Sequence, residues 1–124
     1  MIKVIIAGGR NFDDFNKLCQ VCDEFLQDQN KIEVVSGAFK GADLLGERYA
    51  AERNHPIKQF PADWRRYGKS AGLKRNAEMA AYADALIAFW DGESKGTKHM
   101  IDLATKVGLK VKVIYFHCST TRPV

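Results

Sequence analysis

The chain has few cysteines and no long apolar run. It contains only three cysteines among 124 residues, Cys19, Cys22 and Cys118, and an odd number without a secretion signal argues against a disulfide framework. The longest apolar runs lie near residues 4–7 and 85–90, and both are far too short to cross a membrane. The first residues lack the basic segment and the long apolar segment of a signal peptide. We therefore expect a cytoplasmic protein with no membrane partner.

Several common functional motifs are also missing. No Gly-x-Gly-x-x-Gly occurs, so the standard dinucleotide fingerprint is absent. Gly68-Lys69-Ser70 resembles the end of a phosphate-binding P-loop, but Asp63 stands where that motif requires its first glycine. His55, His99 and His117 lack the spacing of metal ligands. The sequence predicts no metal site and no cofactor.

The charge of the chain is mildly positive. The formal net charge is +4, from 19 Lys and Arg residues and 15 Asp and Glu residues. This excess favours anionic partners but is weak evidence for nucleic acid. Much of it is concentrated in one segment, which holds Arg65, Arg66, Lys69, Lys74 and Arg75. The local cluster is therefore more informative than the total.

Apolar strand patterns alternate with helical patterns along the chain. We expect strands at residues 2–7, 32–35, 57–60, 84–90 and 110–116, and helices from Asp13 or Asp14 to about 29 and at 41–54, 69–82 and 94–107. We expect a loop at 61–68 and a tail at about 117–124, frayed from 119 onward. This alternation predicts one α/β domain over residues 1–124, a Rossmann-like doubly wound parallel sheet of about five strands. A strand order of 3-2-1-4-5, assumed by analogy with dinucleotide-binding folds, places the turns after the first and fourth strands beside one crevice.

Two of the expected helices have clear apolar faces. The first directs Phe15, Leu18, Cys19, Cys22, Phe25 and Leu26 inward, and the last directs Met100, Ile101, Ala104 and Val107 inward. Cys19 and Cys22 have the spacing of a redox pair, but they lie in the middle of a helix. A reactive thiol is expected at a helix start, where the dipole lowers its pKa. We therefore predict that both cysteines pack in the core.

Glycine-bearing turns follow the first and fourth expected strands. The first turn contains Gly8, Gly9 and Arg10, and the second contains Gly92, Ser94, Gly96 and Thr97. Glycines permit close approach of a ligand to the backbone, and the free N–H groups of a helix start bind anions. The second turn is therefore the better phosphate cradle, while the first is either a phosphate contact through Arg10 or a plain tight turn.

The loop after the second expected strand also opens a helix. It contains Ser36, Gly37, Gly41 and Asp43. Its N–H groups could hold an anion, and Asp43 could accept a hydrogen bond from a ribose hydroxyl. Alternatively, this is an ordinary loop in which Asp43 interacts with the helix dipole. Glu47 lies one turn further on the same face as Asp43 and is either functional or solvated.

Aromatic and basic residues are mixed in the segment 61–67. Trp64 or Tyr67 could stack on a base, and Arg65 and Arg66 could hold phosphate. Alternatively, the segment forms a packed loop or a contact between subunits, so a homo-oligomer is a possible state of the protein.

The order of these motifs resembles a known family. The motifs are Ala7 to Phe12, Ser36-Gly37, Gly41 to Glu47, Pro61 to Trp64, Gly68 to Gly72, Arg75 to Met79 and Gly92 to Thr97. Together, from about Met1 to Val113, they resemble the YspA-like family of the SLOG superfamily, which also includes the LOG phosphoribohydrolases and the DNA-processing protein DprA. The resemblance implies a Rossmann-like fold that binds a nucleotide or a nucleotide-derived phosphate ligand, with Asn76 among the ligand-binding residues.

The LOG enzymes give the sharpest comparison. They carry an arginine followed by Ala-Glu-Met before a strand, and a glycine-threonine turn that ends in paired glutamates. Arg75, with Ala77-Glu78-Met79, matches the first feature, but the paired glutamates fall on His99 and Met100. Cleavage of a glycosidic bond needs a placed carboxylate, which methionine cannot supply. The resemblance therefore favours ligand binding over hydrolysis.

Three hypotheses follow. The first is a protein that binds a nucleotide-like small molecule. The second is an N-glycosidic hydrolase of nucleoside monophosphates, with Arg75 and Glu47 as candidate catalytic residues and Asp43 or Asp91 as alternative carboxylates. The third is a DprA-like binder of single-stranded nucleic acid that uses the basic cluster, and the modest net charge makes it the less favoured of the three.

Overall fold

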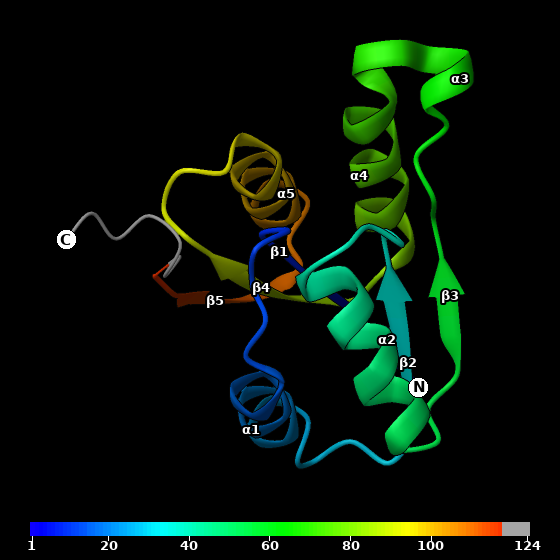
Figure 1. Cartoon of the computed structure of the whole chain (residues 1–124). Coiled ribbons are helices and arrows are strands. Elements are labelled where there is room, and N and C mark those ends of the chain that lie inside the picture. The colour runs from blue at the N-terminus through cyan, green and yellow to red at the C-terminus, as the bar shows by residue number, and fades with distance from the viewer. Residues whose placement is uncertain (118–124) are drawn as a thin grey trace, which may run out of the picture.

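The computed structural model describes residues 1–117 and shows strands and helices in alternation (Figure 1). The strands are β1 (Ile2–Gly8), β2 (Ile32–Ser36), β3 (Ile57–Gln59), β4 (Ala85–Trp90) and β5 (Lys110–Tyr115). The helices are α1 (Phe15–Phe25), α2 (Ala42–Glu52), α3 (Trp64–Tyr67), the 3-10 turn η1 (Gly68–Ser70), α4 (Ala71–Tyr82) and α5 (Lys95–Lys106). No helix among residues 1–117 combines the length and the apolar character that crossing a membrane requires.

The five strands form one parallel sheet in the order β3-β2-β1-β4-β5. The predicted Rossmann-like α/β class is confirmed, and so is the strand order that was assumed by analogy. The direction of winding reverses between β1 and β4, which are paired from Val4 with Ala85 to Gly8 with Phe89. In such sheets the crevice at the carboxyl end of these two strands is the usual ligand position.

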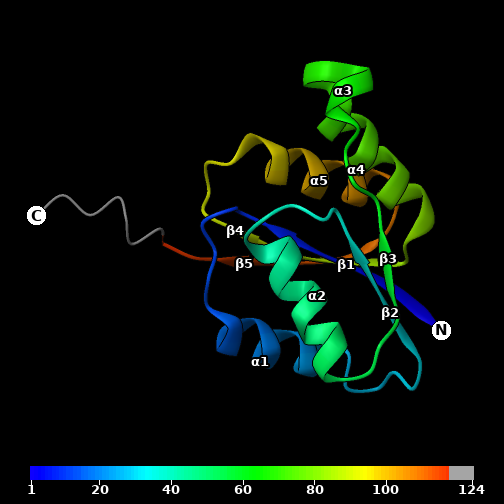
Figure 2. The same ribbon diagram turned by 45° about the vertical axis from the view of Figure 1, so that its right-hand side comes forward.

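Helices cover both faces of the sheet, with α1 and α2 on one side and α4 and α5 on the other (Figure 2). Alternate residues of β1 face the two layers, because successive side chains of a strand point in opposite directions. Val4 and Ile6 pack with α1 and α2, whereas Ile5 packs with α4 and α5. Each such buried side chain contributes about 1.5–3 kcal/mol relative to an exposed one. The two apolar layers fix the ends of β1 and β4 in place.

The loop predicted for residues 61–68 is wrong, because this segment contains α3 and runs on into η1. Asp63 caps α3, since its Oδ1 accepts a hydrogen bond from the Arg66 N–H at 3.1 Å. A four-residue helix is too short to show an apolar period, so the sequence pattern did not indicate it. α3 stands beyond the sheet at the start of α4 (Figure 1).

Two helix ends also differ from expectation. α1 ends at Phe25, although the sequence suggested about residue 29. Val107 was expected to face inward, but it is 53% exposed, because α5 ends at Lys106 and Val107 lies at its C-terminal cap.

The cysteines of α1 pack as predicted. Cys22 lies in the core, Cys19 packs against it, and neither forms a disulfide. Burial raises the pKa of both thiols, most strongly for Cys22, which disfavours the reactive thiolate. Cys118 and the expected frayed tail lie outside the described residues.

Candidate functional site

A cleft of about 600 Å³ opens at the carboxyl end of β1 and β4, on the side covered by α4 and α5. Its walls come from the turn after β1, the loop before α2, the segment from α3 to α4, and the turn between β4 and α5. Of the predicted site residues, those that line it are Gly8, Gly9, Arg10, Asp43, Arg75, Asn76, Ser94, Gly96 and Thr97. The other predicted residues, Ser36, Gly37, Gly41, Glu47 and Gly92, are not part of its lining.

The turn after β1 passes close to neighbouring backbone. A Cβ on Gly8 would lie 2.2 Å from the carbonyl oxygen of Phe89, so only glycine fits there. The Gly9 N–H donates to the same carbonyl at 3.0 Å. The turn is therefore held against β4, and it forms one wall of the cleft.

The loop between β2 and α2 is held by a buried serine. The Ser36 hydroxyl donates to Glu47 Oε2 at 2.7 Å and accepts from the Ala38 N–H at 3.0 Å. Both carboxylate oxygens of Glu47 also accept from the Gln59 amide, at 3.0 and 3.1 Å. Ser36 and Glu47 thus hold the loop in its conformation. The hydrogen bonds of Glu47 are made to Ser36 and Gln59, which do not line the cleft.

Asp43 and Arg75 lie on either side of Gly37. A Cβ on Gly37 would come within 2.6 Å of Arg75 Nη1 and 2.7 Å of Asp43 Oδ2, so a side chain would displace one of them. Arg75 Nη1 donates to the Gly37 carbonyl at 2.7 Å, and Asp43 Oδ2 accepts from the Phe39 N–H at 3.2 Å. These bonds explain why Gly37 is required although it does not line the cleft.

Burial shifts the pKa of both charged groups. Desolvation raises the pKa of Asp43 to about 6, although Arg75 and the Phe39 N–H act in the opposite direction. Desolvation also lowers the pKa of Arg75, and Asp43 partly offsets this. A carboxyl with a pKa near 6 is close to the range in which general acids and bases work.

Asn76 connects α4 to the start of α5. Its Oδ1 accepts from Arg75 Nε at 3.0 Å, and its Nδ2 lies 3.1 Å from His99 Nδ1 and 3.4 Å from the Gly96 carbonyl. The amide nitrogen can only donate, so in this contact His99 Nδ1 is the acceptor. Asn76 therefore orients Arg75 on one side and the α5 turn on the other.

The turn between β4 and α5 is closed by two side chains. Asp91 Oδ1 accepts from the N–H groups of Glu93 and Ser94, both at 2.8 Å, and these bonds lower the pKa of Asp91. Ser94 caps α5 by accepting from the Thr97 N–H at 3.4 Å. Gly92 has a φ of +85°, which permits the turn without lining the cleft. The N–H groups of Ser94 and Thr97 are thus bonded to Asp91 and Ser94, which leaves the N–H groups of Lys95 and Gly96 as those without a partner among the described residues at the start of α5.

Several residues that line the cleft were not predicted to contact a ligand. They are Asn11, Phe39, Leu73, Met79 and Met100. One signal was available, because Gly72, Arg75, Asn76 and Met79 share one face of α4 at helical spacing. Phe39 gave no signal, since its position depends on the path of a loop.

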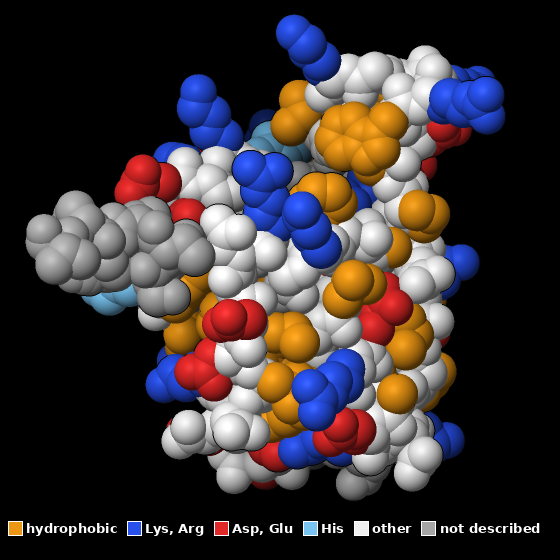
Figure 3. All heavy atoms as spheres, in the orientation of Figure 1, with side chains coloured by type: hydrophobic (Ala, Val, Ile, Leu, Met, Phe, Trp, Pro, Cys, Tyr) orange, Lys and Arg blue, Asp and Glu red, His pale blue; other side chains and the backbone are white. Residues whose placement is uncertain are grey.

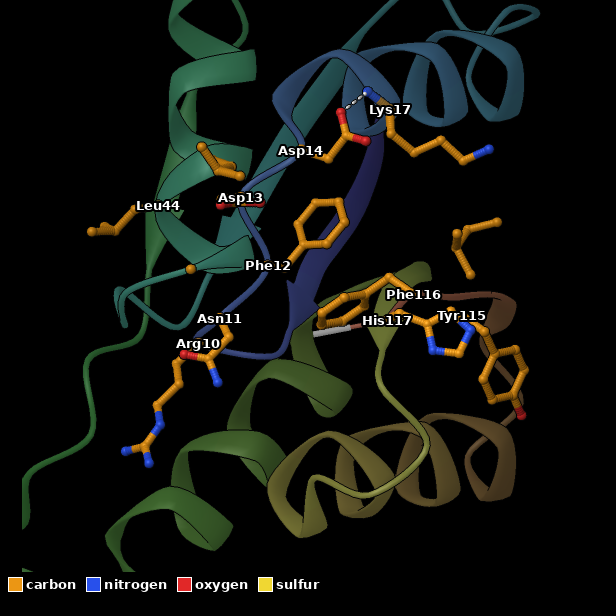
Figure 4. A pocket seen from close by; sticks show the side chains of 13 residues that line it. Arg10, Asn11, Phe12, Asp13, Asp14, Lys17, Leu44, Tyr115, Phe116 and His117 are labelled. Carbon is orange, nitrogen blue, oxygen red and sulfur yellow. Dashed lines mark hydrogen bonds between the residues drawn. The ribbon is translucent and has the colours of Figure 1, made fainter. Parts of the chain in front are cut away.

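A second cavity of about 940 Å³ lies on the other side of the β1 turn, next to α1, α2 and the end of β5 (Figure 4). Arg10 and Asn11 line both cavities, so they form the ridge between them. The apolar wall of the second cavity contains Phe12. Its ring stacks on Phe89 with ring centres 4.6 Å apart and meets Phe116 edge-on with ring centres 5.0 Å apart. Gly41 lines this cavity and not the cleft.

The described part of the chain offers no constellation for a metal ion. Among residues 1–117, no three His, Cys, Asp or Glu side chains lie close enough together to hold one. The polar lining of the cleft consists of backbone N–H groups and of basic, acidic, amide and hydroxyl side chains, namely Arg10, Asn11, Asp43, Lys69, Arg75, Asn76, Asp91, Glu93, Ser94 and Thr97.

This architecture defines a class: Rossmann-like α/β proteins with a polar cleft at the carboxyl edge of a parallel sheet. The chain belongs to the YspA, cpYpsA-related SLOG family, whose model matches residues 2–67. It is also similar to the Gene 61 protein of Mycobacterium phage D29, with 36% identity over 118 residues that cover 90% of this chain and 94% of that protein. The YspA-like family resemblance is thus confirmed. The family match spans β1 to α3, and the similarity to the phage protein extends over most of the rest.

Proposed function

We propose that this protein binds a nucleotide-derived ligand in the cleft, with the phosphate at the start of α5. The observation that carries the proposal is the convergence of the β1 turn, Arg75 and the α5 start at the reversal point between β1 and β4. Membership of a SLOG family fits nucleotide-related binding. The cleft volume of about 600 Å³ lies within the range of small-molecule sites.

The start of α5 suits an anion for two reasons. The N–H groups of Lys95 and Gly96, which the caps of the turn leave free within the described chain, and the helix dipole both favour negative charge. Gly96 lies in the first turn of α5 and lines the cleft, and a Cβ on it would meet nothing within 4 Å. Phosphate oxygens can therefore approach the backbone here without displacing a side chain.

The remaining polar groups suit the sugar. Arg75 supplies a positive charge that Gly37 and Asn76 hold in place, and Asp43 faces the cleft as a hydrogen-bond acceptor for hydroxyl groups. Arg10 and Lys69 add positive charge to the lining. The arrangement combines an anion site with a hydroxyl site, which together match a sugar phosphate.

A matched pair of substitutions tests the proposal. Gly96→Asp adds a carboxylate beside the phosphate position, whereas Gly96→Asn adds a side chain of the same size without charge. We expect AMP or ADP-ribose to raise the melting temperature of the wild-type protein, and we expect Gly96→Asp to weaken binding at least tenfold more than Gly96→Asn. Absence of any shift with a broad panel of nucleotides would contradict the proposal, as would equal effects of the two substitutions.

A second candidate function is cleavage of the N-glycosidic bond. Asp43 favours it, because a carboxyl in the cleft with a pKa of about 6 can donate or accept a proton. Against it, Met100 lines the cleft where LOG enzymes carry a glutamate, and Glu47 is bonded to Ser36 and Gln59. Analysis of the same nucleotide incubations for free base separates the two functions. Nucleotide binding without release of free base would support ligand binding and exclude cleavage.

A further inference from the structure

Trp64 is a large aromatic residue that is exposed but held in position. Its side chain and backbone together are 53% exposed. It begins α3, which Asp63 caps through Arg66, and the Gly68 N–H donates back to the Trp64 carbonyl. The edge of its ring lies against α4, where a Cβ on Gly72 would come within 3.4 Å of Trp64 Cη2. The ring is therefore oriented by a short helix and by a glycine beneath it.

Other exposed apolar side chains line the same cleft as Trp64. Phe39 is 42% exposed and Leu73 is 49% exposed, and both belong to its lining. Apolar side chains lie beside Lys and Arg side chains over α3 and the start of α4 (Figure 3). The polar groups of the cleft, such as Thr97 and Asn76, are buried. The cleft thus has a polar floor and a rim in which Phe39, Trp64 and Leu73 stand beside charged side chains such as Arg10 and Lys69. Such a rim suits a ligand with a charged end and a flat apolar end.

The neighbouring aromatic residue, Tyr67, has a different environment. Arg66 and Lys74 lie over its ring, at 5.2 and 4.9 Å from the ring centre, and Tyr67 does not line the cleft. Trp64 lines the cleft, and no Lys or Arg of residues 1–117 lies over its ring. Of the two aromatic residues on α3, only Trp64 presents a free ring to a ligand within the described part of the chain.

We propose that Trp64 is the base-stacking residue of the cleft and that the ligand is a nucleotide whose aromatic base lies on the indole ring. This inference rests on the proposed function, which places the phosphate at the start of α5, and it adds the chemical class of the other end of the ligand. Stacking tolerates any base, because every base has an aromatic face, and it strengthens with the area of the ring. Purine nucleotides are therefore bound more tightly than pyrimidine nucleotides.

Trp64→Ala tests the proposal, with Trp64→Phe as the conservative variant and Tyr67→Ala as the matched control on the same helix. The probes are AMP, GMP, CMP and UMP, with ribose 5-phosphate as the same polar part without a base, and binding is measured by titration calorimetry. We expect Trp64→Ala to lower the affinity for AMP by about 5- to 100-fold. We expect its affinity for ribose 5-phosphate to stay within about twofold of the wild-type value, Trp64→Phe to keep most of the AMP affinity, and Tyr67→Ala to bind normally.

The possible failures are distinguishable. If the wild-type protein binds none of the four nucleotides and no ribose 5-phosphate, the proposed function fails and base stacking fails with it. If ribose 5-phosphate binds but AMP binds no more tightly, or if Trp64→Ala binds AMP like the wild type, base stacking alone is overturned. Equal losses for AMP and ribose 5-phosphate would assign Trp64 a structural role. A change of sedimentation from oligomer to monomer in Trp64→Ala, with unchanged AMP affinity, would assign the ring to a contact with a second copy of the chain.

Discussion

Asp43 makes the free energy of unfolding depend on pH in an unusual direction. The residue is only 6% exposed, and desolvation raises its pKa from 3.8 to about 6. Arg75 and the Phe39 N–H stabilise the ionised form of Asp43, and Glu47 destabilises it. Desolvation outweighs these contributions, so the pKa of Asp43 is raised. Most surface carboxyls that are paired in a folded protein have the opposite shift. We therefore expect the ligand-free protein to lose stability through Asp43 as the pH rises.

The sign and size follow from the two pKa values. Below about pH 4 the carboxyl is protonated in both the folded and the unfolded states, so it does not affect their difference. Between its unfolded pKa and about pH 6 the folded state binds more protons, so the stability falls as the pH rises. Above about pH 6 the full penalty is present. At about 1.4 kcal/mol per pKa unit, a rise from 3.8 to about 6 corresponds to about 3 kcal/mol.

Asp43→Asn removes this charge and keeps an oxygen that can accept from the Phe39 N–H. We expect the stability of the variant, relative to the wild-type protein, to rise by about 3 kcal/mol between pH 4 and pH 7. The assay is urea unfolding of both proteins at each pH, without ligand. Any difference at pH 4 reports altered contacts, so only the change with pH is interpreted. A constant difference, or one that falls with pH, would refute the reasoning and show that Arg75 keeps Asp43 ionised.

Two further substitutions, and a third that serves as a control, test the turns around the site. Gly41→Ala places a Cβ 2.4 Å from the Gly9 carbonyl oxygen, at a φ of +87°, and we expect it to lower the free energy of urea unfolding by about 3 kcal/mol or more. Gly96→Ala is its control, because open space surrounds that position, and we expect no loss; equal stability of the two variants would contradict the steric argument. Asp91→Asn should cost about 1 kcal/mol at pH 7, because two N–H groups lower the pKa of Asp91 and so stabilise the carboxylate. That contribution is lost as the pH falls through the folded pKa, so wild type and variant should converge in acid; a difference that does not shrink would count against it.

The fold was largely predictable because its elements are long and their apolar patterns regular. The run at residues 2–7 could only be a buried strand, and the glycine turns marked where strands end. The strand order came from analogy, since no periodicity encodes which strands pair. α3 was missed because four residues cannot show a helical period, and Val107 was misplaced because the helix ended one residue earlier.

The candidate site was predictable at its turns and not between them. Gly8 and Thr97 line the cleft because each lies near the end of an element whose position the sequence indicated, and Arg75 lines it from within a predicted helix. Ser36 was predicted to lie at the ligand because it follows a strand at this sheet edge, and Glu47 because it shares a helix face with Asp43. In the structure the Ser36 hydroxyl donates to Glu47 Oε2 at 2.7 Å, a pairing that depends on the orientation of α2 and that the sequence does not indicate. Phe39 and Leu73 reach the cleft through tertiary packing, which has no local signal.

The contact of Gly41 with the β1 turn has a mechanical consequence. The Ala42 N–H donates to the Gly9 carbonyl at 3.2 Å, and the backbones at Gly41 and Arg10 leave no room for even a methyl group. The two loops after β1 and β2 are therefore packed directly against each other, and a change in the path of one alters its contacts with the other. α3 stands beyond the sheet at the start of α4 (Figure 1), and its Trp64 packs over Gly72 of α4 rather than against these two loops. An engineer who wants this scaffold to accept a different molecule should leave the two fused loops intact and vary the residues of α3.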